Sequence, residues 1–296
     1  KHIGFVGASG LMGHGMAKNI RAKGFELSLT VHSRTEPVQD LLAAGAKRVA
    51  GYPDLAVCDA VVICVTGSPQ VEAVVAGPGG LLSKARAGLI VIDTSTSEPD
   101  STRRLAALCA EKGVIYVDAP LTRTPVEAEQ GRLNTMVGAS NEVFEKISPV
   151  LQAYCENVFH VGETGAGHVI KLLNNFIAQA ICTASAEAFA VGTKAGVDVR
   201  QLVRVVSAGG ANSGLFQAMA KTLDGDFTGL KFELNNAAKD LRYYCHLTES
   251  VKAPSLIGSN VHQALNLAAG LGFGSELVPS LVKAQSRVNG LKIGEN

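Results

Sequence analysis

The first half of the chain alternates short hydrophobic runs with longer segments of mixed polarity. The runs read HIGFVG (2–7), LSLTVHS (27–33), AVVICVT (60–66), LIVIDTS (89–95), VIYVDAP (114–120) and NTMVGA (134–139). Short apolar strands separated by helix-length segments predict βαβ units and a parallel sheet covered on both faces. We therefore expect a nucleotide-binding α/β domain over residues 1–162.

After GETGAGH (162–168) the pattern changes to long helical segments, and no further strand is predicted down to Asn296. Residues 163–296 are expected to form an all-α domain. Its first helix, about residues 167–194, would be about 40 Å long and is apolar on nearly every side, which raises a membrane span as an alternative. Polar residues inside it argue against that alternative: Lys171, Asn174, Asn175, Gln179 and Glu187. We expect the helix to run through the domain core and against a second subunit.

Composition and charge indicate an ordinary globular protein that binds neither nucleic acid nor a membrane surface. The 296 residues are 47% hydrophobic, and 27 Lys and Arg stand against 26 Asp and Glu. We therefore expect neither nucleic acid nor a membrane surface as a partner. The six cysteines are widely spaced and never form C-x-x-C, which favours reduced thiols and a cytoplasmic location. The opening KHIGFVG predicts no secretory signal, and no cluster has metal-ligand spacing, so no metal is expected.

The segment GFVGASGLMGHGMAKNI (4–20) is a glycine-rich turn with one residue more than the familiar phosphate-binding fingerprint. G-x-G-x-x-G has six positions, whereas seven residues run from Gly7 to Gly13. A strand enters the turn and a helix follows it, so main-chain N–H groups and the helix dipole can receive a pyrophosphate. We predict a lengthened dinucleotide-binding turn; an ordinary tight turn is the alternative. The predicted cofactor residues are Gly7, Ser9, Gly10, Leu11 and Met12.

The end of the second predicted strand bears on which dinucleotide binds. NAD sites place an Asp or Glu there on the ribose 2′-hydroxyl, whereas NADP sites place an Arg near the 2′-phosphate. This chain reads VHSRT, with Ser33, Arg34 and Thr35 and no acid. The three residues are predicted to bind the cofactor and favour NADP, with NAD as the alternative. A surface arginine at the end of a strand, unrelated to the cofactor, is the alternative explanation of the pattern.

Five blocks, in order, resemble the β-hydroxyacid dehydrogenases, the family of 3-hydroxyisobutyrate dehydrogenase, tartronate semialdehyde reductase and related semialdehyde reductases. The blocks are residues 4–20, DTSTSEP (93–99), DAPLTRTPVEAEQGRLNTMVGA (118–139), GAGHVIKLLNN (165–175) and FELNNAAKDL (232–241). Together they cover nearly the whole chain. The resemblance implies a Rossmann-like α/β domain, an all-α C-terminal domain similar to that of 6-phosphogluconate dehydrogenase, and reversible NAD(P)-dependent oxidation of a 3-hydroxyacid.

Within this resemblance, Lys171 corresponds to the catalytic lysine. When hydride leaves or reaches the carbinol carbon, one proton must leave or join its oxygen, so an acid/base has to contact that oxygen. A lysine inside an apolar helix can have its pKa lowered by desolvation. Asn175 shares its helix face and Asn174 lies beside it, so both are predicted to bind substrate. A lysine that snorkels out of a buried helix is the alternative, and His168 is interpreted as helix-start structure.

The resemblance also implies further cofactor contacts. Thr96 in DTST corresponds to a hydroxyl near the nicotinamide, and Val65 and Thr66 in CVTG correspond to the loop beside the cofactor. Phe232 and Lys239, followed by Asp240, match a block that helps to close the site. For these last residues a packed phenylalanine and an ion pair are an equally simple explanation.

One block departs from the family pattern. The family follows DAP with V-S-G-G, whose serine and glycine main chain hold the substrate carboxylate, whereas this chain has LTRT (121–124). Thr122 keeps a hydroxyl, and the planar fork of Arg123 suits an anion. We predict that both bind substrate and that Arg123 binds a carboxylate or a sulfonate, because TRT (122–124) is similar to a GRT variant at this position that resembles sulfolactaldehyde reductases. An arginine turned to solvent is the alternative.

The sequence therefore predicts an NAD(P)-dependent oxidoreductase for a small-molecule hydroxyacid or semialdehyde. An imine reductase of the same architecture is one alternative, but those sites usually replace the lysine that stands here at Lys171. A non-catalytic nucleotide-binding protein is another. The apolar helix at about 167–194 favours a homodimer or homotetramer.

Overall fold

The computed structural model describes residues 1–31 and 35–294. By packing, the chain divides into two compact units, Lys1–Lys171 and Leu172–Asn296, each described here by itself. The division falls inside one long helix, whereas the boundary predicted from the sequence lies at the end of the preceding strand.

Unit 1 is built on a nine-stranded sheet. Its strands are β1 (His2–Val6), β2 (Glu26–Thr30), β3 (Lys47–Val49), β4 (Ala60–Ile63), β5 (Ile90–Asp93), β6 (Ile115–Asp118), β7 (Leu121–Thr122), β8 (Leu133–Gly138) and β9 (Cys155–Gly162). The order is β3-β2-β1-β4-β5-β6-β8-β7, with β9 also paired to β8. All pairs from β3 to β6 are parallel, whereas β8 runs antiparallel to β6 and β7. The parallel part confirms the predicted α/β class, and β3, β7 and β9 are strands that the hydrophobic pattern missed.

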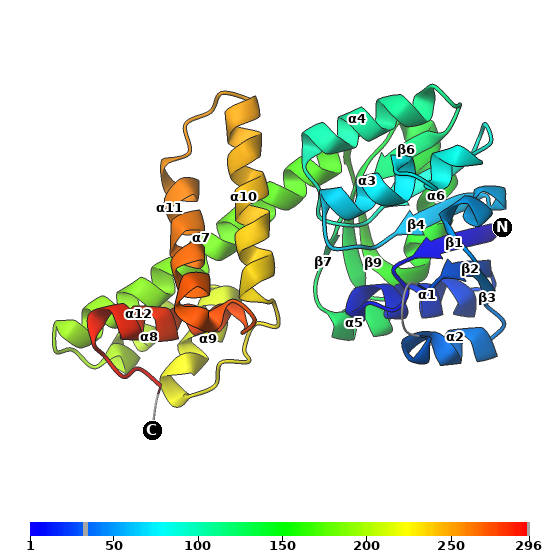
Figure 1. Ribbon diagram of the computed structural model, residues 1–296. Coiled ribbons are helices and arrows are strands. Elements are labelled where there is room, and N and C mark those ends of the chain that lie inside the picture. The colour runs from blue at the N-terminus through cyan, green and yellow to red at the C-terminus, as the bar shows by residue number, and fades with distance from the viewer. Residues whose placement is uncertain (32–34, 295–296) are drawn as a thin grey trace. The chain divides into compact units, whose positions relative to one another are not determined.

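Helices cover both faces of this sheet (Figure 1). They are α1 (Leu11–Ala22), α2 (Gln39–Ala43), α3 (Ser68–Ala76), α4 (Pro99–Ala110), α5 (Pro125–Glu129) and α6 (Asn141–Tyr154), with short helices η1 (Glu36–Val38), η2 (Tyr52–Val57) and η3 (Leu81–Ser83). On β4, Val62 belongs to the apolar cluster under α1, α2, α5 and α6, whereas Val61 and Ile63 belong to the cluster under α3 and α4. A strand buried on both sides explains why it is a continuous apolar run.

Unit 2 is helical. Helix α7 (Ala166–Lys194) begins in unit 1 and continues into unit 2. The other helices are α8 (Val199–Ser207), α9 (Gly214–Ala220), α10 (Leu234–Ser250), α11 (Leu256–Ala268) and α12 (Leu281–Asn289), with short helices η4 (Lys221–Asp224), η5 (Ala269–Phe273) and η6 (Val278–Ser280). A lone bridge joins Glu233 to Leu277. The helical content confirms the predicted all-α second domain.

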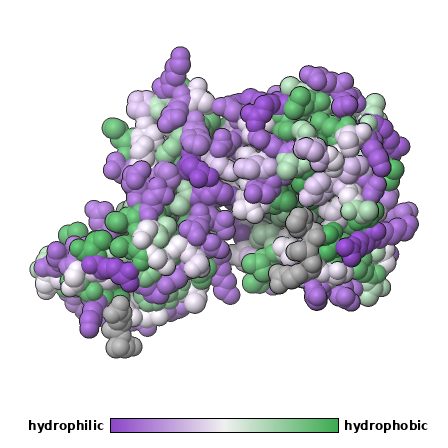
Figure 2. All heavy atoms as spheres, in the orientation of Figure 1, coloured by the Kyte–Doolittle hydropathy of each residue, from purple (hydrophilic) through white to green (hydrophobic). Residues whose placement is uncertain are grey.

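Among the described residues, α7 is the one helix long and apolar enough, by length and composition, to cross a membrane. Its residues Cys182, Ala186 and Phe189 lie in the apolar core of unit 2, with at most 1% of their surface exposed. A helix that supplies the core of a folded unit needs the same composition. Figure 2 shows hydrophilic and hydrophobic residues interspersed over the visible face of each unit.

Candidate active site

The carboxyl ends of four neighbouring strands meet along one edge of the sheet in unit 1. Register pairs Val6 of β1 with Ile63 of β4, Ile63 with Asp93 of β5, and Asp93 with Asp118 of β6. The loops that leave this edge carry the predicted residues of the glycine turn, of CVTG, of DTST and of LTRT. The strand order reverses between β1 and β4, and open α/β sheets bind ligands in the crevice at such a point.

The glycine turn leaves β1 at this edge. Gly7 has φ +95°, and a Cβ built there would lie 2.0 Å from the carbonyl oxygen of Cys64. Only glycine fits that position, because neither the backbone angle nor the space admits a side chain. The Gly10 N–H donates to the Gly7 carbonyl over 3.0 Å, so the extra residue is absorbed in a hydrogen-bonded turn before α1 begins at Leu11.

The apex of this turn is exposed and suits an anion. Ser9, Gly10 and Leu11 are exposed, and Met12 is half-buried. Gly10 is the N-cap of α1 and makes no side-chain cap hydrogen bond, and the first turn of α1 holds no acid. First-turn N–H groups without a capping side chain form an anion site at the positive end of the helix dipole. The predicted pyrophosphate residues therefore lie together in a suitable geometry.

The segment after β2 is described only in part. Ser33 and Arg34, which favour NADP, lie outside the described residues. Thr35 is the N-cap of η1, and its hydroxyl lies 3.5 Å from Nη1 of Arg48 on β3. Arg48 thus brings a second cation to the segment that is predicted to select the cofactor. Arg48 was not predicted as a site residue, since KRV (47–49) is too short and polar to be recognised as a strand.

The loops after β4 and β5 hold each other in place. The Val65 N–H donates to Oγ of Ser95 over 3.0 Å, and the Ser95 N–H donates to Oδ1 of Asp93 over 2.9 Å. Ser95 and Ser97 are buried, whereas Thr96 between them is half-buried. The predicted cofactor residues Val65, Thr66 and Thr96 therefore belong to two interlocked loops on the same edge as the glycine turn.

The start of α7 is anchored to the same edge through buried polar groups. Asp118 at the end of β6 accepts from the N–H groups of Gly165 (2.6 Å) and His168 (2.8 Å). The His168 ring contacts Oγ1 of Thr102 through Nδ1 over 2.7 Å and the carbonyl of Ser95 through Nε2 over 3.0 Å. Burial raises the pKa of Asp118. His168 is fully buried, so its role is structural, as interpreted from the sequence.

Lys171 follows His168 by one helical turn and is half-buried. Because Asp118 and His168 fix the first turn of α7, the direction in which the Lys171 side chain leaves the helix is fixed as well. The backbone that carries Lys171 is thus rigidly supported, as a proton donor requires, and its catalytic role stays a prediction.

Beyond Lys171, the same helix carries a polar network that belongs to unit 2. The Asn175 amide Nδ2 donates to Oδ2 of Asp240 over 2.7 Å, and Asn174 Nδ2 donates to Oδ1 of Asn175 over 3.1 Å. Lys239 Nζ lies 3.1 Å from Oδ1 of Asp240, which is 2% exposed. Asp240 therefore connects the two predicted substrate asparagines with the predicted cofactor residue Lys239.

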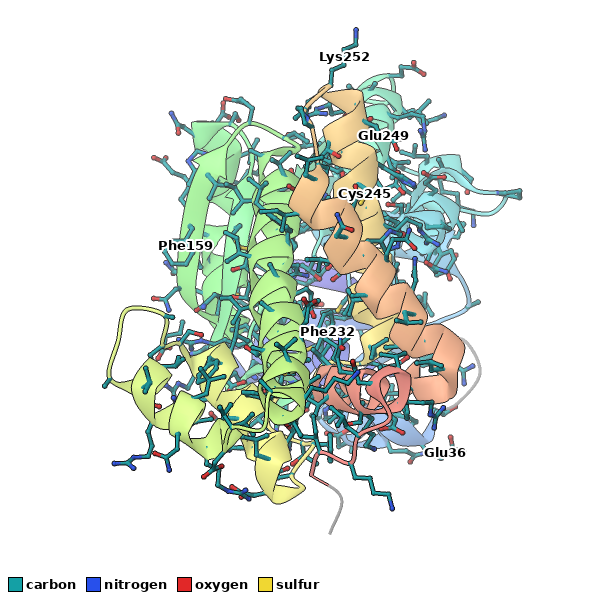
Figure 3. All side chains as sticks on the ribbon, turned by 90° about the vertical axis from the view of Figure 1, so that its left-hand side faces the viewer. Glu36, Phe159, Phe232, Cys245, Glu249 and Lys252 are labelled. Carbon is teal, nitrogen blue, oxygen red and sulfur yellow. The ribbon has the colours of Figure 1, made fainter. Side chains whose placement is uncertain are left out.

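Phe232 precedes α10 in unit 2 (Figure 3). It is half-buried against the apolar core of that unit. Its carbonyl accepts from the Val278 N–H over 2.9 Å. The structure thus gives Phe232 a packing role, and its predicted contact with the cofactor stays a prediction.

The LTRT segment combines a strained backbone with a paired arginine. Thr122 pairs with Asn134 in the β7–β8 ladder, and Arg123 has φ +81°, a left-handed conformation that favours glycine. The residue therefore keeps the backbone of the glycine that the family pattern has there. Nη1 of Arg123 donates to the Arg132 carbonyl and to Glu156 on β9, and Arg132 Nε also donates to Glu156. The side chain is 30% exposed, so it is held by Glu156 and is not turned freely to solvent.

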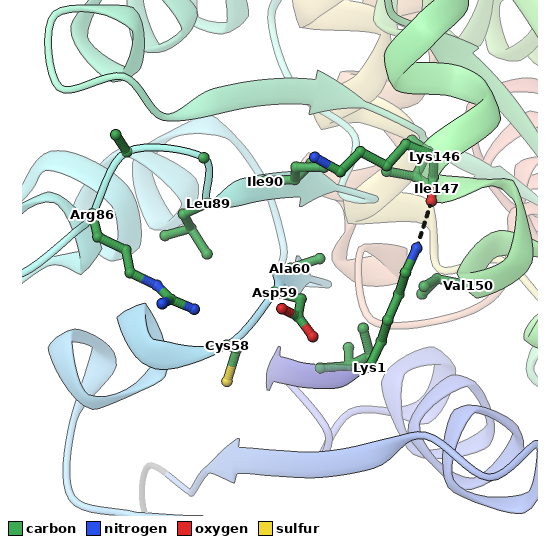
Figure 4. A pocket seen from close by; sticks show the side chains of 13 residues that line it. Lys1, Cys58, Asp59, Ala60, Arg86, Leu89, Ile90, Lys146, Ile147 and Val150 are labelled. Carbon is green, nitrogen blue, oxygen red and sulfur yellow. Dashed lines mark hydrogen bonds between the residues drawn. The ribbon is translucent and has the colours of Figure 1, made fainter.

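A pocket of about 190 Å³ lies in unit 1 at the opposite edge of the sheet, where β1, β4 and β5 begin (Figure 4). Lys1, Asp59, Arg86 and Lys146 contribute charged groups to its lining. It contains none of the predicted site residues. The chemistry of the carboxyl-terminal edge, and not this pocket, therefore defines the candidate site. Within residues 1–31 and 35–294 no group of three or more His, Cys, Asp or Glu could hold a metal ion.

Family models match both parts of the chain. Residues 2–162 match the NAD binding domain of 6-phosphogluconate dehydrogenase, and residues 165–284 match the NAD-binding domain of NADP-dependent 3-hydroxyisobutyrate dehydrogenase. The chain belongs to the β-hydroxyacid dehydrogenase family. This confirms the family resemblance and makes the protein an NAD(P)-dependent oxidoreductase of the hydroxyacid dehydrogenase type.

Curated relatives cover almost the full chain of this β-hydroxyacid dehydrogenase. A 2-(hydroxymethyl)glutarate dehydrogenase of Eubacterium barkeri is 33% identical, over 98% of this chain and 97% of that protein. An L-threonate dehydrogenase of Haemophilus influenzae is 32% identical over 85% of each. A solved 3-hydroxyisobutyrate dehydrogenase from Salmonella typhimurium has TM-score 0.80 and 28% identity, covering 95% of this chain and 99% of that one. An imine reductase from Pseudomonas, at 17% identity and TM-score 0.59, shares the fold alone.

Proposed function

We propose that this dehydrogenase interconverts a small 3-hydroxyacid and its semialdehyde, with NADP as the preferred cofactor and Lys171 as the acid/base. The observation that supports the proposal is the anchored first turn of α7: Asp118, at the carboxyl edge of the sheet, accepts from the N–H groups of Gly165 and His168, and Lys171 follows His168 by one turn. A presented lysine on a rigid turn is what proton transfer to a carbonyl oxygen requires.

The reaction divides between cofactor and protein. A bound nicotinamide would supply hydride to the carbonyl carbon, or accept it from the carbinol carbon. During reduction, Lys171 Nζ donates a proton to the oxygen, and during oxidation it takes that proton back. Asn174 and Asn175 orient the oxygen or the lysine, and Asp240 holds Asn175 in place through the 2.7 Å hydrogen bond.

The exposed, uncapped turn from Ser9 to Met12 fits the pyrophosphate of the cofactor. Preference for NADP rests on Arg34 and Thr35 in the sequence, and on Arg48 beside Thr35. Val65, Thr66 and Thr96 are assigned to the nicotinamide side, and Phe232 and Lys239 to the block that covers the cofactor. NAD remains the alternative that a direct comparison decides.

Thr122 and Arg123 are proposed to bind the acid group of the substrate, as carboxylate or sulfonate. Both contacts of Arg123 use Nη1, and a guanidinium carries five N–H donors. An incoming anion would therefore exchange with Glu156 or add to the remaining donors. A sulfonate, as in sulfolactaldehyde, and a carboxylate, as in methylmalonate semialdehyde, both suit such a fork.

We further propose a soluble cytoplasmic homodimer or homotetramer. Helix α7 leaves apolar side chains at its surface, among them Ile177 (58% exposed) and Val191 (60% exposed). A contact between copies of the chain would bury such residues. The six cysteines are free, as a reducing compartment requires. Gel filtration with light scattering tests the assembly, and a monomer would contradict it.

The test of the reaction is initial rate with NADPH and with NADH on succinic, tartronate and methylmalonate semialdehydes, glyoxylate and sulfolactaldehyde. Turnover of at least one, faster with NADPH, is expected. Lys171→Met should lower kcat about 10²- to 10⁴-fold, while Lys194→Met, at the far end of the same helix, should leave it unchanged. Absence of turnover, or an active Lys171→Met, would overturn the proposal.

A further inference from the structure

His14 on α1 is held between carboxylates from two other helices. Its Nδ1 lies 2.5 Å from Oε1 of Glu129, the last residue of α5. Its Nε2 lies 3.0 Å from both carboxylate oxygens of Asp40 on α2. Lys18, one turn further along α1, donates to the other oxygen of Glu129 over 3.0 Å. The imidazole is 23% exposed, whereas Asp40 (57%), Glu129 (38%) and Lys18 (52%) are more exposed and are screened by water.

The partners of the ring decide its protonation. An ionised carboxylate only accepts hydrogen bonds, so each ring nitrogen that contacts one must carry a proton. A neutral imidazole carries a single N–H and could donate to Glu129 or to Asp40, but not to both. The arrangement therefore requires the imidazolium. Loss of one proton breaks one of its two hydrogen bonds, which we call the Glu129 tie and the Asp40 tie.

Other contacts fix α5 to α1 more rigidly than α2. A Cβ built on Gly15 would lie 2.4 Å from the carbonyl carbon of Ala128, so α5 approaches as closely as backbone allows. Asn19 Nδ2 also donates to the carbonyls of Ala128 (3.0 Å) and Glu129 (3.2 Å). The contacts between α1 and α2 are fewer. Among the described residues, the hydrogen bond of His14 to Asp40 is joined by one other side-chain hydrogen bond, from Arg21 Nε on α1 to the carbonyl of Ala44, the residue just after α2. The Asp40 tie is therefore the one more open to change.

Both helices follow segments assigned above to ligands. Helix α2 follows η1, which begins directly after Thr35 in the segment that selects the cofactor. Helix α5 begins directly after Arg123 and Thr124, and Thr124 caps it. We propose that protonated His14 is a positioning residue for the cofactor. Through Asp40 it holds α2, the helix that follows Thr35 and η1, against α1, the helix that receives the pyrophosphate. This inference rests on the proposed function for the roles of Thr35 and α1, but not for the contact between His14 and Asp40 itself.

The charges around the ring give the direction of its pH dependence. Burial alone would lower the pKa of His14, but hydrogen bonds and charges of Glu129 and Asp40 raise it above its ordinary value. The same contact with His14 lowers the pKa of Asp40. A raised histidine pKa means that the tie is fully present below pH 6.5, the ordinary histidine value, and is lost as the pH rises through the folded-state pKa.

The tie is tested first without turnover, by NMR titration of histidine ring C–H signals in the full chain, with His14→Gln to assign the signal. We expect His14 to titrate above pH 6.5, and Asp40→Asn and Glu129→Gln each to shift that titration to lower pH. A His14 that titrates at or below 6.5, or that ignores both substitutions, would overturn the proposal.

Its positioning role is tested by the Kd of NADPH, from fluorescence, and by KM of the accepted aldehyde, from pH 6 to 9. The Kd of NADPH should rise about two- to fivefold across the His14 titration in the unsubstituted protein. KM of the aldehyde and kcat should change little, because Gly15 and Asn19 hold α5 to α1 whatever the charge of His14. His14→Gln should show the high Kd at every pH, and His14→Lys, which stays charged, the lower Kd at every pH.

His2→Gln is the matched control, because the His2 ring contacts a hydroxyl, Ser28, at the opposite edge of the sheet. It should keep the pH dependence of the unsubstituted protein. If no aldehyde is reduced, the proposed reaction fails, while the titration and the Kd still decide the tie. A Kd of NADPH that does not change with pH, in a protein whose His14 titrates above pH 6.5, would refute the positioning role and leave the cluster a surface ion network.

Discussion

Asn175 on α7 and Asp240 on α10 share a 2.7 Å hydrogen bond in the interior of unit 2, where they are 6% and 2% exposed. The bond leaves the Asn175 side-chain oxygen facing Asn174. An amide with one orientation fixed by a carboxylate is better suited to orient a reacting oxygen than a freely rotating amide. In the proposed function, Asp240 is therefore a positioning residue that acts through Asn175.

We expect Asp240→Ala to lower kcat by up to about 100-fold, because the Asn175 amide loses its partner and its orientation. Asp240→Asn keeps one acceptor oxygen and should restore part of the rate. Steady-state kinetics with thermal melting of each variant checks this. If both variants lose stability equally but keep kcat, Asp240 is structural only.

The anchoring of α7 gives a second prediction. Asp118 accepts one N–H with each oxygen, from Gly165 and from His168. Asp118→Asn replaces one acceptor by an NH₂ group that faces an N–H, so we expect a loss of about 1–3 kcal/mol in the free energy of unfolding. Urea unfolding measures it. Asp100→Asn is the control: Asp100 is an exposed carboxylate on α4 that pairs with Arg103 of the same helix, and the substitution should change the free energy of unfolding little.

Local sequence patterns predicted most of the sheet and the glycine turn, because the relevant interactions lie within a few residues. The strands from Ala60, Ile90 and Ile115 are apolar runs in register with one another, and Gly7 is needed at the point where its pattern predicts a turn. The bounds of the long helix were also predicted to within one residue, because its apolar character continues from one end to the other.

Partners distant in the sequence were not predictable in the same way. Asp240 stands in a recognised block, but its bond to Asn175 depends on how α10 packs on α7. Glu156 pairs with Arg123 only because β9 adds to β8. The division of the chain after Lys171 falls inside a helix, where no change in composition marks it.

Arg48 gives a prediction about cofactor choice. Its guanidinium lies beside Thr35, in the segment assigned to the 2′-phosphate. Arg48→Ala should raise KM for NADPH about fivefold, the effect of one exposed charge contact, and leave KM for NADH unchanged. Arg86→Ala, an exposed arginine at the opposite edge of the sheet, should change neither. An equal rise in KM for NADPH and NADH would show that Arg48 supports the fold and does not bind the 2′-phosphate.

Arg123 gives the prediction that separates backbone from side chain. Because Arg123 has φ +81°, Arg123→Gly keeps a turn that glycine adopts freely and removes only the guanidinium. We expect KM of the substrate to rise about 10- to 100-fold with kcat nearly preserved, and Arg123→Lys to recover part of the loss, because a lysine keeps the charge but not the planar fork.

The ion pair between Arg123 and Glu156 allows a second substitution, for which the opposite change in KM is expected. If the substrate anion must take the place of Glu156 on the guanidinium, then Glu156→Gln removes the competitor and should lower KM, by about two- to fivefold. KM that rises in Glu156→Gln would instead mean that Glu156 presents Arg123 to the substrate. KM unchanged in Arg123→Gly and in Glu156→Gln would show that the arginine is only a cross-link between β9 and the loop after β7.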